Sequence, residues 1–385
     1  MNLVKTIADI NEKIRSGKAV VVTAEEIIDI VEEKGIKKTL EEVDVVTTAT
    51  FGPMCSSGMF INFGHSSPGI RMCKTWLNDV PVFSGIAAVD AYVGATEMSE
   101  RLGMQYGGAH VIQDFIDGKD IRLYAESYGT DCYPRKEIKT TINKNNVNQA
   151  FLFNPRNCYQ NYPAATNSTD RTMYTYMGTL LPLFGNVTYS TSGELSPLLN
   201  DPEYRSIGIG TRILLGGAQG YVAWEGTQHD PAQERLENGV PVNLAGALAL
   251  IGDAKMMSSK YIRAAVFEKY GVTMFVGIGI PIPVLDEDIL IKAAVRNRDI
   301  ITTLVDKSGR ENMNMKFTYE ELRSGSIEIR GKKVPTAPLS SLKVAREIAA
   351  ELKRQITAGE FFLTEFVQRL PMRNERLNKL DIRGE

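Results

Sequence analysis

Hydrophobic and polar positions along the first 35 residues alternate with the periods of a helix, a strand and a second helix. Apolar residues recur at helical spacing over residues 6–14. A β-branched run over residues 19–23 predicts a short strand. Thr23 precedes Glu26 by three residues, the spacing of a capping box, so we expect the next helix to begin here and to end at Gly35.

A second strand is predicted over the β-branched residues 43–50, and it runs directly into the turn-rich sequence FGPMCSSGMF. That sequence contains Cys55. Loops that follow strands in α/β proteins commonly carry binding and catalytic residues. Cys55 therefore stands where chemistry is expected.

Farther along the chain, the pattern predicts a helical stretch over residues 244–271, a buried strand over residues 273–285 and a C-terminal helical segment over about 338–371. Alternating strands and helices favour the α/β class. We expect a mixed or mainly parallel sheet flanked by helices, with glycine-rich loops carrying the site. Residues 1–385 are interpreted as a single large catalytic domain.

The charge balance excludes a general nucleic-acid binder. The 385 residues include 44 Lys and Arg against 46 Asp and Glu, a formal net charge of −2, whereas proteins that neutralise phosphates carry a strong basic excess. No apolar run approaches the roughly 20 residues that cross a bilayer. The N-terminal residues 1–18 lack the apolar centre of a signal peptide. We therefore expect a cytoplasmic protein without a membrane partner.

Two glycine-rich segments come close to nucleotide-binding loops without completing one. Gly208-x-Gly210 is followed at the third position by Ile213, where the dinucleotide fingerprint requires Gly or Ala. Residues 277–281 fail in the same way, and GxxxxGK[ST] does not occur. Close packing of a strand against a helix is the favoured use of these glycines.

The four cysteines are too few for a secreted disulfide scaffold and too irregularly spaced for a structural zinc site. In a cytosolic protein they are either buried apolar residues or working thiols. Cys55 lies in GPMCSSG, where backbone N–H groups and two hydroxyls can surround a thiolate and lower its pKa. Cys55 is our candidate nucleophile.

Cys132 lies in a second loop, YGTDCYPR. Its neighbour Asp131 opposes formation of a thiolate, so we interpret Cys132 as a resolving thiol rather than as the first nucleophile. Cys73 and Cys158 both have basic neighbours, and the pattern leaves their roles open.

Four further residues are candidates for contact with a substrate. His65, ten residues after Cys55, could act as the base for this cysteine or orient a substrate carboxylate. Arg71, Arg156 and Arg212 lie among glycine, proline or polar loop residues, where a guanidinium can bind a carboxylate through two parallel hydrogen bonds. An ordinary surface ion pair is the alternative for each arginine.

Several long motifs resemble one family. They are TATFGPMCSSGMFINFGHSSPGIRM, LNDVPVFSGIAAVDAYVGATE, YGTDCYPR, NPRNCYQNYPAATN and GIGTRILLGGAQGYVAWEGTQH. Together they are similar to the homocysteine biosynthesis family, the L-aspartate semialdehyde sulfurtransferases of methanogenic archaea and some anaerobic bacteria. The likeness runs through nearly the whole chain. Some relatives append CBS domains, and the resemblance implies no CBS or ferredoxin module within these 385 residues.

The resemblance implies that homocysteine is built from aspartate semialdehyde, a sulfide-level sulfur donor and two electrons. The functional cysteines of the family are carried by the FGPMC and YGTDC motifs, here Cys55 as sulfur carrier and Cys132 as resolving or second sulfur-relay thiol. The sequence has no complete nicotinamide fingerprint and no haem or ferredoxin motif, so we expect an external electron donor. The resemblance implies that this donor is a small ferredoxin-like protein.

Two alternatives stay open at this point. Three of the four cysteines could converge from distant loops on a [4Fe-4S] cluster, with sulfide bound to the open iron. The chain could instead be a non-catalytic sulfur carrier or scaffold for a partner that performs the chemistry. The sequence is compatible with a homo-oligomer and does not decide the oligomeric state.

Overall fold

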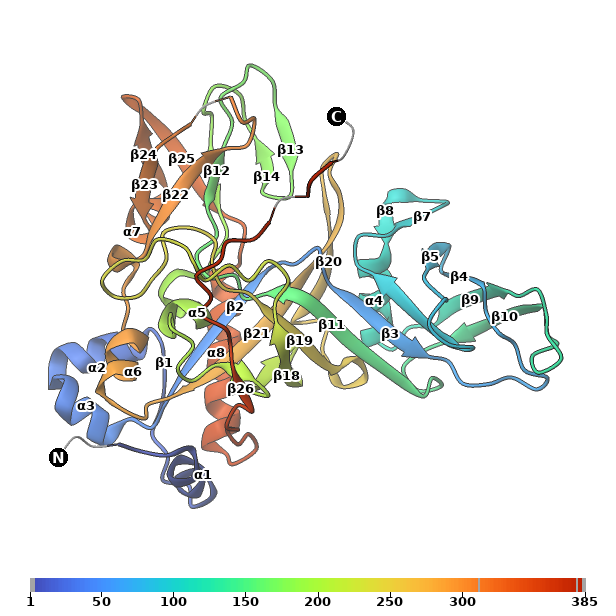
Figure 1. The fold of residues 1–385 in the computed structure, drawn as a ribbon, viewed down its shortest axis with the longest axis horizontal. Coiled ribbons are helices and arrows are strands. Elements are labelled where there is room, and N and C mark those ends of the chain that lie inside the picture. The colour runs from blue at the N-terminus through green and yellow to red at the C-terminus, as the bar shows by residue number, and fades with distance from the viewer. Residues whose placement is uncertain (1–3, 311, 379, 383–385) are drawn as a thin grey trace.

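A large mixed sheet forms the centre of the computed structural model, which describes residues 4–310, 312–378 and 380–382 (Figure 1). Its strands are β1 (Val21–Thr23), β2 (Val45–Pro53), β3 (Gly58–Asn62), β6 (Asp90–Gly94), β11 (Gln149–Asn157), β17 (Arg212–Leu215), β18 (Ala218–Glu225), β19 (Leu248–Asp253), β20 (Ile262–Phe267) and β21 (Gly271–Pro283). They pair in the order β1-β2-β21-β17-β18-β19-β11-β3-β6, and β20 pairs with β21 beside this path. β1 and β2 run parallel, and the other pairs are antiparallel.

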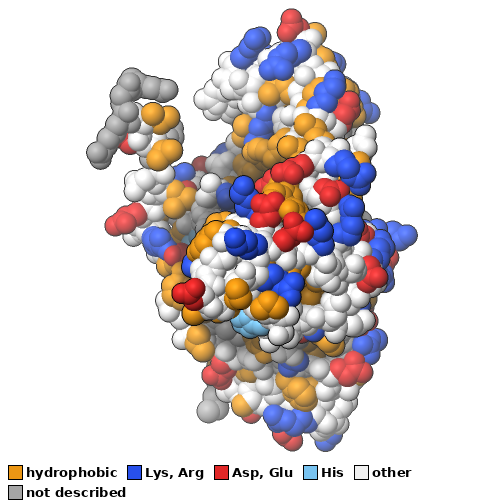
Figure 2. All heavy atoms as spheres, turned by 90° about the vertical axis from the view of Figure 1, so that its right-hand side faces the viewer, with side chains coloured by type: hydrophobic (Ala, Val, Ile, Leu, Met, Phe, Trp, Pro, Cys, Tyr) orange, Lys and Arg blue, Asp and Glu red, His pale blue; other side chains and the backbone are white. Residues whose placement is uncertain are grey.

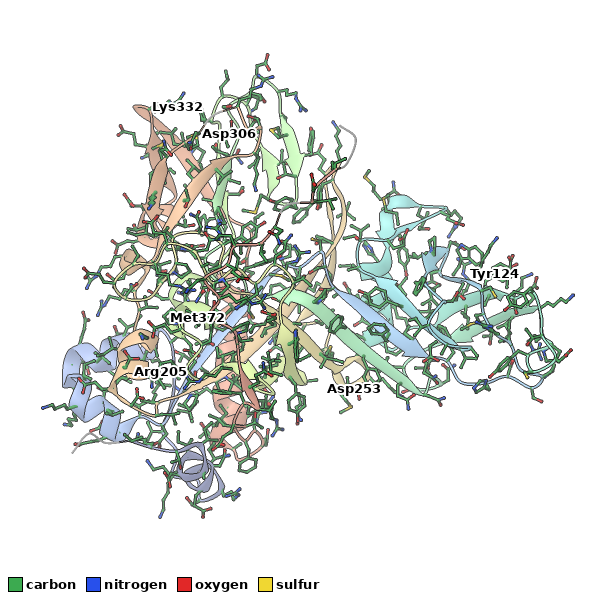
Figure 3. The ribbon with its side chains drawn as sticks, viewed as in Figure 1. Tyr124, Arg205, Asp253, Asp306, Lys332 and Met372 are labelled. Carbon is green, nitrogen blue, oxygen red and sulfur yellow. The ribbon has the colours of Figure 1, made fainter. Side chains whose placement is uncertain are left out.

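One face of this sheet is covered by helices from both halves of the chain, at the lower left and bottom of Figure 1. These helices are α1 (Ile7–Arg15), α2 (Glu26–Lys34), α3 (Ile36–Glu42), α6 (Glu287–Ala293) and α8 (Leu342–Thr357). Their apolar faces share a core with β1, β2 and β21. Arg205 connects the segment after residue 200 to the start of α6, because its guanidinium pairs with Asp286 at 2.8 Å and with Asp288 at 2.7 Å (Figure 3).

A smaller antiparallel sheet lies at the right-hand end of Figure 1. It contains β4 (Lys74–Leu77), β5 (Val80–Val82), β9 (Ile121–Glu126) and β10 (Glu137–Ile142), in the order β10-β9-β4-β5. The hairpin of β7 (Met98–Ser99) and β8 (Gly103–Gly107) leads into α4 (Gly108–Ile116), which packs against β20 and β3. β3 and β11 connect this end of the molecule to the centre.

A second mixed sheet rises at the top of Figure 1. It contains β12 (Ala164–Thr166), β15 (Val187–Tyr189), β22 (Ile301–Asp306), β23 (Met315–Thr318), β24 (Ser326–Ile329) and β25 (Lys332–Pro338), in the order β23-β22-β12-β15-β25-β24. The remaining elements are the hairpin β13 (Met173–Thr175) and β14 (Gly178–Leu180), the pair β16 (Gly208–Ile209) and β26 (Gln368–Arg369), the helices α5 (Pro197–Asn200) and α7 (Tyr319–Arg323), and the 3-10 turns η1 (Gly193–Leu195), η2 (Ala254–Met256) and η3 (Asn297–Asp299).

Most of the N-terminal predictions are confirmed. Helix α1 begins after Thr6, whose side chain caps it, and strand β2 begins at Val45, two residues into the predicted run 43–50, and continues through Pro53. Thr23 and Glu26 exchange the two hydrogen bonds of a capping box, and Gly35 ends α2 at a φ of 76°. Residues 1–3 of the predicted N-terminal pattern lie outside the described residues.

The helical stretch predicted over residues 244–271 is wrong. These residues form β19, the short turn η2 and β20 instead. Alanine and leucine favour helices in isolation, but β19 lies between β11 and β18 in the central sheet, where long-range pairing decides the conformation. The strand predicted over residues 273–285 is confirmed as β21.

The α/β class and the mixed sheet are confirmed, whereas a mainly parallel sheet is not what the chain forms. Between named strands of the described residues, parallel pairing occurs for β1 with β2, β12 with β22, and β15 with β25. Within the segment 338–371, helix α8 covers Leu342–Thr357, and residues after Gly359 are extended or turns.

The glycines of β21 serve close packing, as predicted. A Cβ on Gly277 would lie 2.7 Å from the side chain of Ile348, and one on Gly279 would lie 3.2 Å from the same residue. Helix α8 can therefore approach β21 closely only because these two positions lack side chains.

Acidic and basic side chains are interspersed over the end of the molecule that Figure 2 faces, in keeping with a net charge of −2. Among the described residues, no helix has both the length and the apolar composition needed to span a bilayer.

Candidate functional site

Cys55 lies in a tight turn between the central strands β2 and β3. The N–H of Met54 donates to the carbonyl of Met274 on the neighbouring strand at 2.7 Å, which fixes the start of the turn. Ser57 closes it, because its N–H and its hydroxyl both donate to the carbonyl of Met54, at 3.2 and 2.8 Å. The side chain of Cys55 is exposed on this turn.

The serine hydroxyls that follow Cys55 do not surround its thiol, contrary to our expectation. Ser56 Oγ donates to Asn154 Oδ1 and to the carbonyl of Arg156, at 3.3 and 3.2 Å. Ser57 Oγ donates back to Met54. Both hydroxyls thus stabilise the turn instead of solvating a thiolate.

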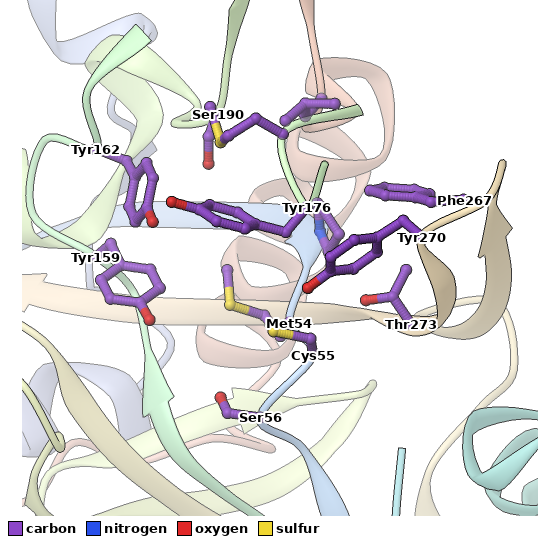
Figure 4. Close-up of a pocket in the computed structure, with 13 residues that line it drawn as sticks. Met54, Cys55, Ser56, Tyr159, Tyr162, Tyr176, Ser190, Phe267, Tyr270 and Thr273 are labelled. Atoms are coloured by element: carbon purple, nitrogen blue, oxygen red, sulfur yellow. The ribbon is translucent and has the colours of Figure 1, made fainter. Parts of the chain in front are cut away.

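Tyrosines surround the cavity onto which Cys55 opens (Figure 4). The cavity encloses about 70 Å³, room for a few water-sized groups. Cys55 and Met54 form one side, and Tyr159, Tyr162, Tyr176 and Tyr270 form much of the rest. Ser190 and Leu339, at the ends of β15 and β25, complete the wall toward the upper sheet.

The four tyrosines form a chain of ring contacts around this cavity. The ring centroids of Tyr159 and Tyr162 are 5.0 Å apart, those of Tyr162 and Tyr176 are 6.3 Å apart, and those of Tyr176 and Tyr270 are 6.4 Å apart. All three pairs meet edge to face, the arrangement that aromatic quadrupoles prefer.

Three separate turns bring these rings together. After β11, Cys158 and Asn161 adopt positive φ angles of 50° and 56°, which reverse the chain and turn Tyr159 and Tyr162 toward the cavity. Tyr176 lies in the turn of the β13–β14 hairpin, and Tyr270 lies in the turn between β20 and β21.

Burial and a neighbouring lysine shift the pKa values of these phenols in different directions. Desolvation raises the pKa of Tyr159 to about 12 and also raises the pKa of Tyr162. Tyr176 is different, because Lys307 Nζ donates to its hydroxyl at 2.6 Å. Although burial opposes the shift, Lys307 and the Tyr162 hydroxyl hold the pKa of Tyr176 below its usual value.

Cys158 lies directly behind this site and is buried, with 3% of its surface exposed. It lines a second cavity of about 10 Å³ together with Met54 and Tyr159, both of which also line the larger cavity. Burial raises the pKa of the Cys158 thiol well above its usual value. This thiol is therefore neutral and closed to substrate in this conformation.

Cys132, in the loop between β9 and β10, and His65, after β3, lie in neighbouring loops, and neither lines the Cys55 cavity. Strand β3 carries the chain away from the Cys55 turn for five residues, roughly 13 Å. Beyond its far end, His65 stacks on Tyr133 with ring centroids 6.0 Å apart, and the exposed Cys132 precedes that tyrosine. A disulfide needs Cα atoms within about 7 Å, so this conformation does not bring Cys55 and Cys132 together.

The three candidate arginines lie in three different places. Arg71 donates to Tyr128 at 3.1 Å on the surface of the small sheet, near the exposed Cys73. Arg212 stacks over the ring of Phe361 at 4.6 Å, beneath the C-terminal segment.

Arg156 alone of these arginines adjoins the cavity. Its carbonyl accepts the hydroxyl of Ser56, a lining residue, and its guanidinium contacts Gln228. Its buried Nε has no hydrogen-bond partner. Its charge also reaches Tyr159, where it opposes the rise in pKa caused by burial. Arg156 is therefore the sequence candidate best placed to meet an anionic group.

The cluster alternative needs at least three ligands that meet in one place. Within residues 4–310, 312–378 and 380–382, no group of three or more His, Cys, Asp or Glu side chains is placed to share a metal ion. Cys55, Cys73 and Cys132 are exposed in separate segments, and Cys158 is buried.

The sequence analysis missed the tyrosines and Lys307. Tyr159 and Tyr162 belong to the quoted motif NPRNCYQNYPAATN, whose closely spaced aromatic residues in a polar, asparagine-rich segment were the available signal. Tyr176, Tyr270 and Lys307 come from three further turns or strand ends, and only the fold brings them to Cys55.

Comparison with known proteins points to one family. A family model described as "Homocysteine biosynthesis enzyme, sulfur-incorporation" matches residues 19–363, a range that contains the whole cavity lining. A Methanosarcina acetivorans protein named L-aspartate semialdehyde sulfurtransferase is 53% identical over 369 residues, 95% of this chain and 72% of that protein. A Methanocaldococcus jannaschii protein with the same name is 52% identical over 386 residues, 96% of this chain and 74% of that protein. No solved structure is a significant match.

Proposed function

The chain belongs to the homocysteine biosynthesis family, and we propose that it is an L-aspartate semialdehyde sulfurtransferase whose reaction takes place in the Cys55 cavity. The observation that carries this assignment of the site is the position of Cys55. Of the four cysteines, all within the described ranges, Cys55 is the one that lines the tyrosine-walled cavity.

The overall conversion fixes what the site must supply. An aldehyde, hydrogen sulfide, two electrons and two protons give a thiol and water. The carbonyl carbon loses its two bonds to oxygen and gains one bond to sulfur and one to hydrogen. The cavity offers a soft nucleophile for sulfur and several phenols for protons, whereas the electrons come from an external carrier, proposed to be a ferredoxin-like protein.

Cys55 is proposed to carry the sulfur as a persulfide. The outer sulfur of a persulfide is two electrons more oxidised than sulfide, so sulfide alone cannot load the free Cys55 thiol, and the donor for this step is a sulfur compound at the persulfide level. If a second thiol releases it, that thiol and Cys55 are left as a disulfide. The reductant must then supply two electrons to the disulfide besides the two taken up by the aldehyde carbon.

The proposed second thiol, Cys132, stays a prediction. Because Cys132 lies beyond the far end of β3, it could reach a Cys55 sulfur only on another molecule or after a large rearrangement of its own chain. Its exposure on the surface loop between β9 and β10 suits contact between molecules.

Arg156 is proposed to bind the α-carboxylate of the amino-acid aldehyde. Its place beside Ser56 and the reach of its charge to Tyr159 favour it over Arg71 and Arg212, which make their contacts elsewhere. His65, stacked on Tyr133 at the other end of β3, has no proposed contact with the substrate in this conformation.

The test compares two cysteine variants. Cys55→Ser is expected to abolish formation of homocysteine, whereas Cys73→Ser, which alters an equally exposed thiol away from the cavity, should retain it. Purified chain is assayed anaerobically with aldehyde, a persulfide-level sulfur donor and an artificial reductant. Full activity of Cys55→Ser would contradict the assignment of the site, and inactivity of the unaltered chain without its partner would favour the sulfur-carrier alternative.

A separate measurement tests whether the protein binds an iron–sulfur cluster. Iron and acid-labile sulfide are determined in anaerobically purified protein. Because no three ligands converge in the described parts of the chain, we expect no stoichiometric iron within a monomer. Stoichiometric iron lost in Cys55→Ser would instead place a cluster at this site.

A further inference from the structure

Tyr176 differs from the other cavity tyrosines in having a cation at its hydroxyl. Lys307 Nζ donates to Tyr176 Oη at 2.6 Å, and the ammonium lies 4.7 Å from the centre of the same ring. Lys307 is fixed by its backbone, because its N–H donates to the carbonyl of Thr166 at 2.9 Å and extends the pairing of β12 with β22. The preceding Asp306 is anchored by Ser168 and Ser308 (Figure 3).

The other ionisable groups that face Tyr176 come from three different segments. Tyr162 interacts with its hydroxyl, Tyr270 packs at its ring edge, and Cys55 lies below it in the same cavity (Figure 4). A thiolate at Cys55 would raise the pKa of Tyr176, whereas Lys307 and Tyr162 lower it. Tyr176 is thus a phenol whose anionic form Lys307 stabilises, and it lines the same cavity as the Cys55 thiol.

We propose that Tyr176 is the proton donor to the aldehyde oxygen when sulfur adds to the carbonyl carbon, with Lys307 as the positioning residue that stabilises the resulting phenolate. This inference rests on the proposed function, since it assigns a residue to the addition step in the Cys55 cavity.

The addition step balances without a change of redox state. A sulfur anion forms a bond to the carbonyl carbon, the carbon–oxygen π bond breaks, and the oxygen takes the proton of Tyr176 Oη. The products are a hydroxy-thio adduct and a phenolate paired with Lys307. The next sulfur donor, entering as S–H, returns the proton to the phenolate. The later reduction draws its two electrons from the external carrier already required.

The phenol suits this step better than the other groups at hand. Tyr159 and Tyr162 have pKa values raised by burial, which makes them poorer acids. General acid catalysis is most effective when the pKa of the donor approaches the working pH. Among the cavity tyrosines within the described ranges, Tyr176 is the one whose pKa is shifted in that direction.

The first experiment uses a closely matched pair of tyrosines. Tyr174, on the same hairpin, also meets a lysine, with Lys269 Nζ 3.3 Å from its hydroxyl, but it does not line the cavity. Tyr176→Phe should lower kcat roughly 100-fold or more. Tyr174→Phe should leave kcat within about threefold of the unaltered chain. Tyr176→Phe turnover within that same margin would overturn the proposal.

Sulfur loading separates this inference from the proposed function. The protein is incubated with a persulfide-level sulfur donor, and persulfide on Cys55 is trapped by alkylation and measured by mass spectrometry. Tyr176→Phe should load sulfur normally and stall afterwards, because it lacks only the proton for the carbonyl oxygen. If the variant cannot load sulfur, Tyr176 acts on sulfur and the inference fails. If the unaltered chain never loads Cys55, the proposed function fails instead.

A second measurement does not depend on turnover. Tyr176 phenolate is followed as the difference in ultraviolet absorption between the unaltered chain and Tyr176→Phe during a pH titration. The lysine cation favours the phenolate, so Lys307→Met should raise the pKa of Tyr176 and move this titration to higher pH. The high-pH decline of kcat should move in the same direction, because the donor must be protonated. Lys269→Met should move neither curve, and unchanged curves in Lys307→Met would overturn the role of Lys307.

Discussion

Asn154 Nδ2 donates to Ser57 Oγ at 2.6 Å, and this buried contact joins strand β11 to the turn that holds Cys55. The same amide group accepts hydrogen bonds through Oδ1 from Ser56 Oγ and from the N–H of Arg156, at 3.3 and 2.9 Å. One fully buried side chain therefore fixes the serine after the thiol, the serine that closes the turn and the candidate carboxylate-binding arginine.

Asn154→Ala should loosen this turn and destabilise the protein. Leaving buried polar partners unsatisfied costs about 1–3 kcal/mol, so the free energy of unfolding in urea should fall by this amount and homocysteine formation should fall with it. Asn148→Ala is the control, because Asn148 is exposed and its side-chain amide donates to the side-chain amide of Asn62. Equal stability of the two variants would show that the Asn154 contacts do not support the turn.

The four cysteines should differ sharply in their reaction with a neutral alkylating agent. Cys55, Cys73 and Cys132 are exposed and should be modified in the native protein. Cys158 should be modified only after unfolding, since it is buried and its thiol is held neutral. Peptide mass spectrometry before and after addition of urea measures this difference, and rapid native labelling of Cys158 would reveal an opening of the cavity that this conformation lacks.

Arg156→Lys should weaken binding of the aldehyde. A lysine cannot form two parallel hydrogen bonds with a carboxylate, and loss of a charged hydrogen bond worth roughly 1.5–3 kcal/mol raises KM about ten- to hundredfold. Arg71→Lys and Arg212→Lys should leave KM unchanged, because their guanidinium groups contact Tyr128 and Phe361. A rise in KM confined to either control variant would place the carboxylate elsewhere.

Mixing two variants tests whether Cys55 and Cys132 act on each other between two molecules. If Cys132 of one molecule acts on Cys55 of another, Cys55→Ser and Cys132→Ser are each inactive, but a mixture of the two regains part of the activity. Recovery is measured as homocysteine formed against protein concentration. No recovery from two inactive variants would require each chain to bring its own thiols together, and an active Cys132→Ser would remove this residue from the reaction.

Local patterns predicted the surroundings of Cys55 well. The β-branched run 43–50 and the following Gly-Pro-Met-Cys-Ser-Ser sequence identified a strand, a turn and an exposed thiol, because all three depend on residues close together in the chain. The same reasoning failed for residues 244–271, where pairing with β11 and β18 outweighs the helical propensity of alanine and leucine.

Residues that meet across the fold could not be predicted in this way. His65 lies ten residues from Cys55, but the intervening strand β3 is extended and carries it to another part of the molecule. Tyr270 lies more than two hundred residues away and still lines the same cavity. Residues that are close in the sequence can lie far apart when the chain between them is extended. Residues that are far apart in the sequence can meet when the strands that carry them pair in one sheet or in neighbouring sheets.

Most residues that line the Cys55 cavity are synthesised well after Cys55 itself. Cys55 is synthesised early, but Tyr159, Tyr270 and Leu339 emerge from the ribosome long afterwards, and the cavity needs all of them. A nascent chain, or a fragment ending before Leu339, therefore carries the thiol without its enclosure. If Cys55 carries the sulfur as proposed, sulfur bound to such a chain would have no enclosed cavity beside it, so the order of synthesis delays the reaction until folding is complete.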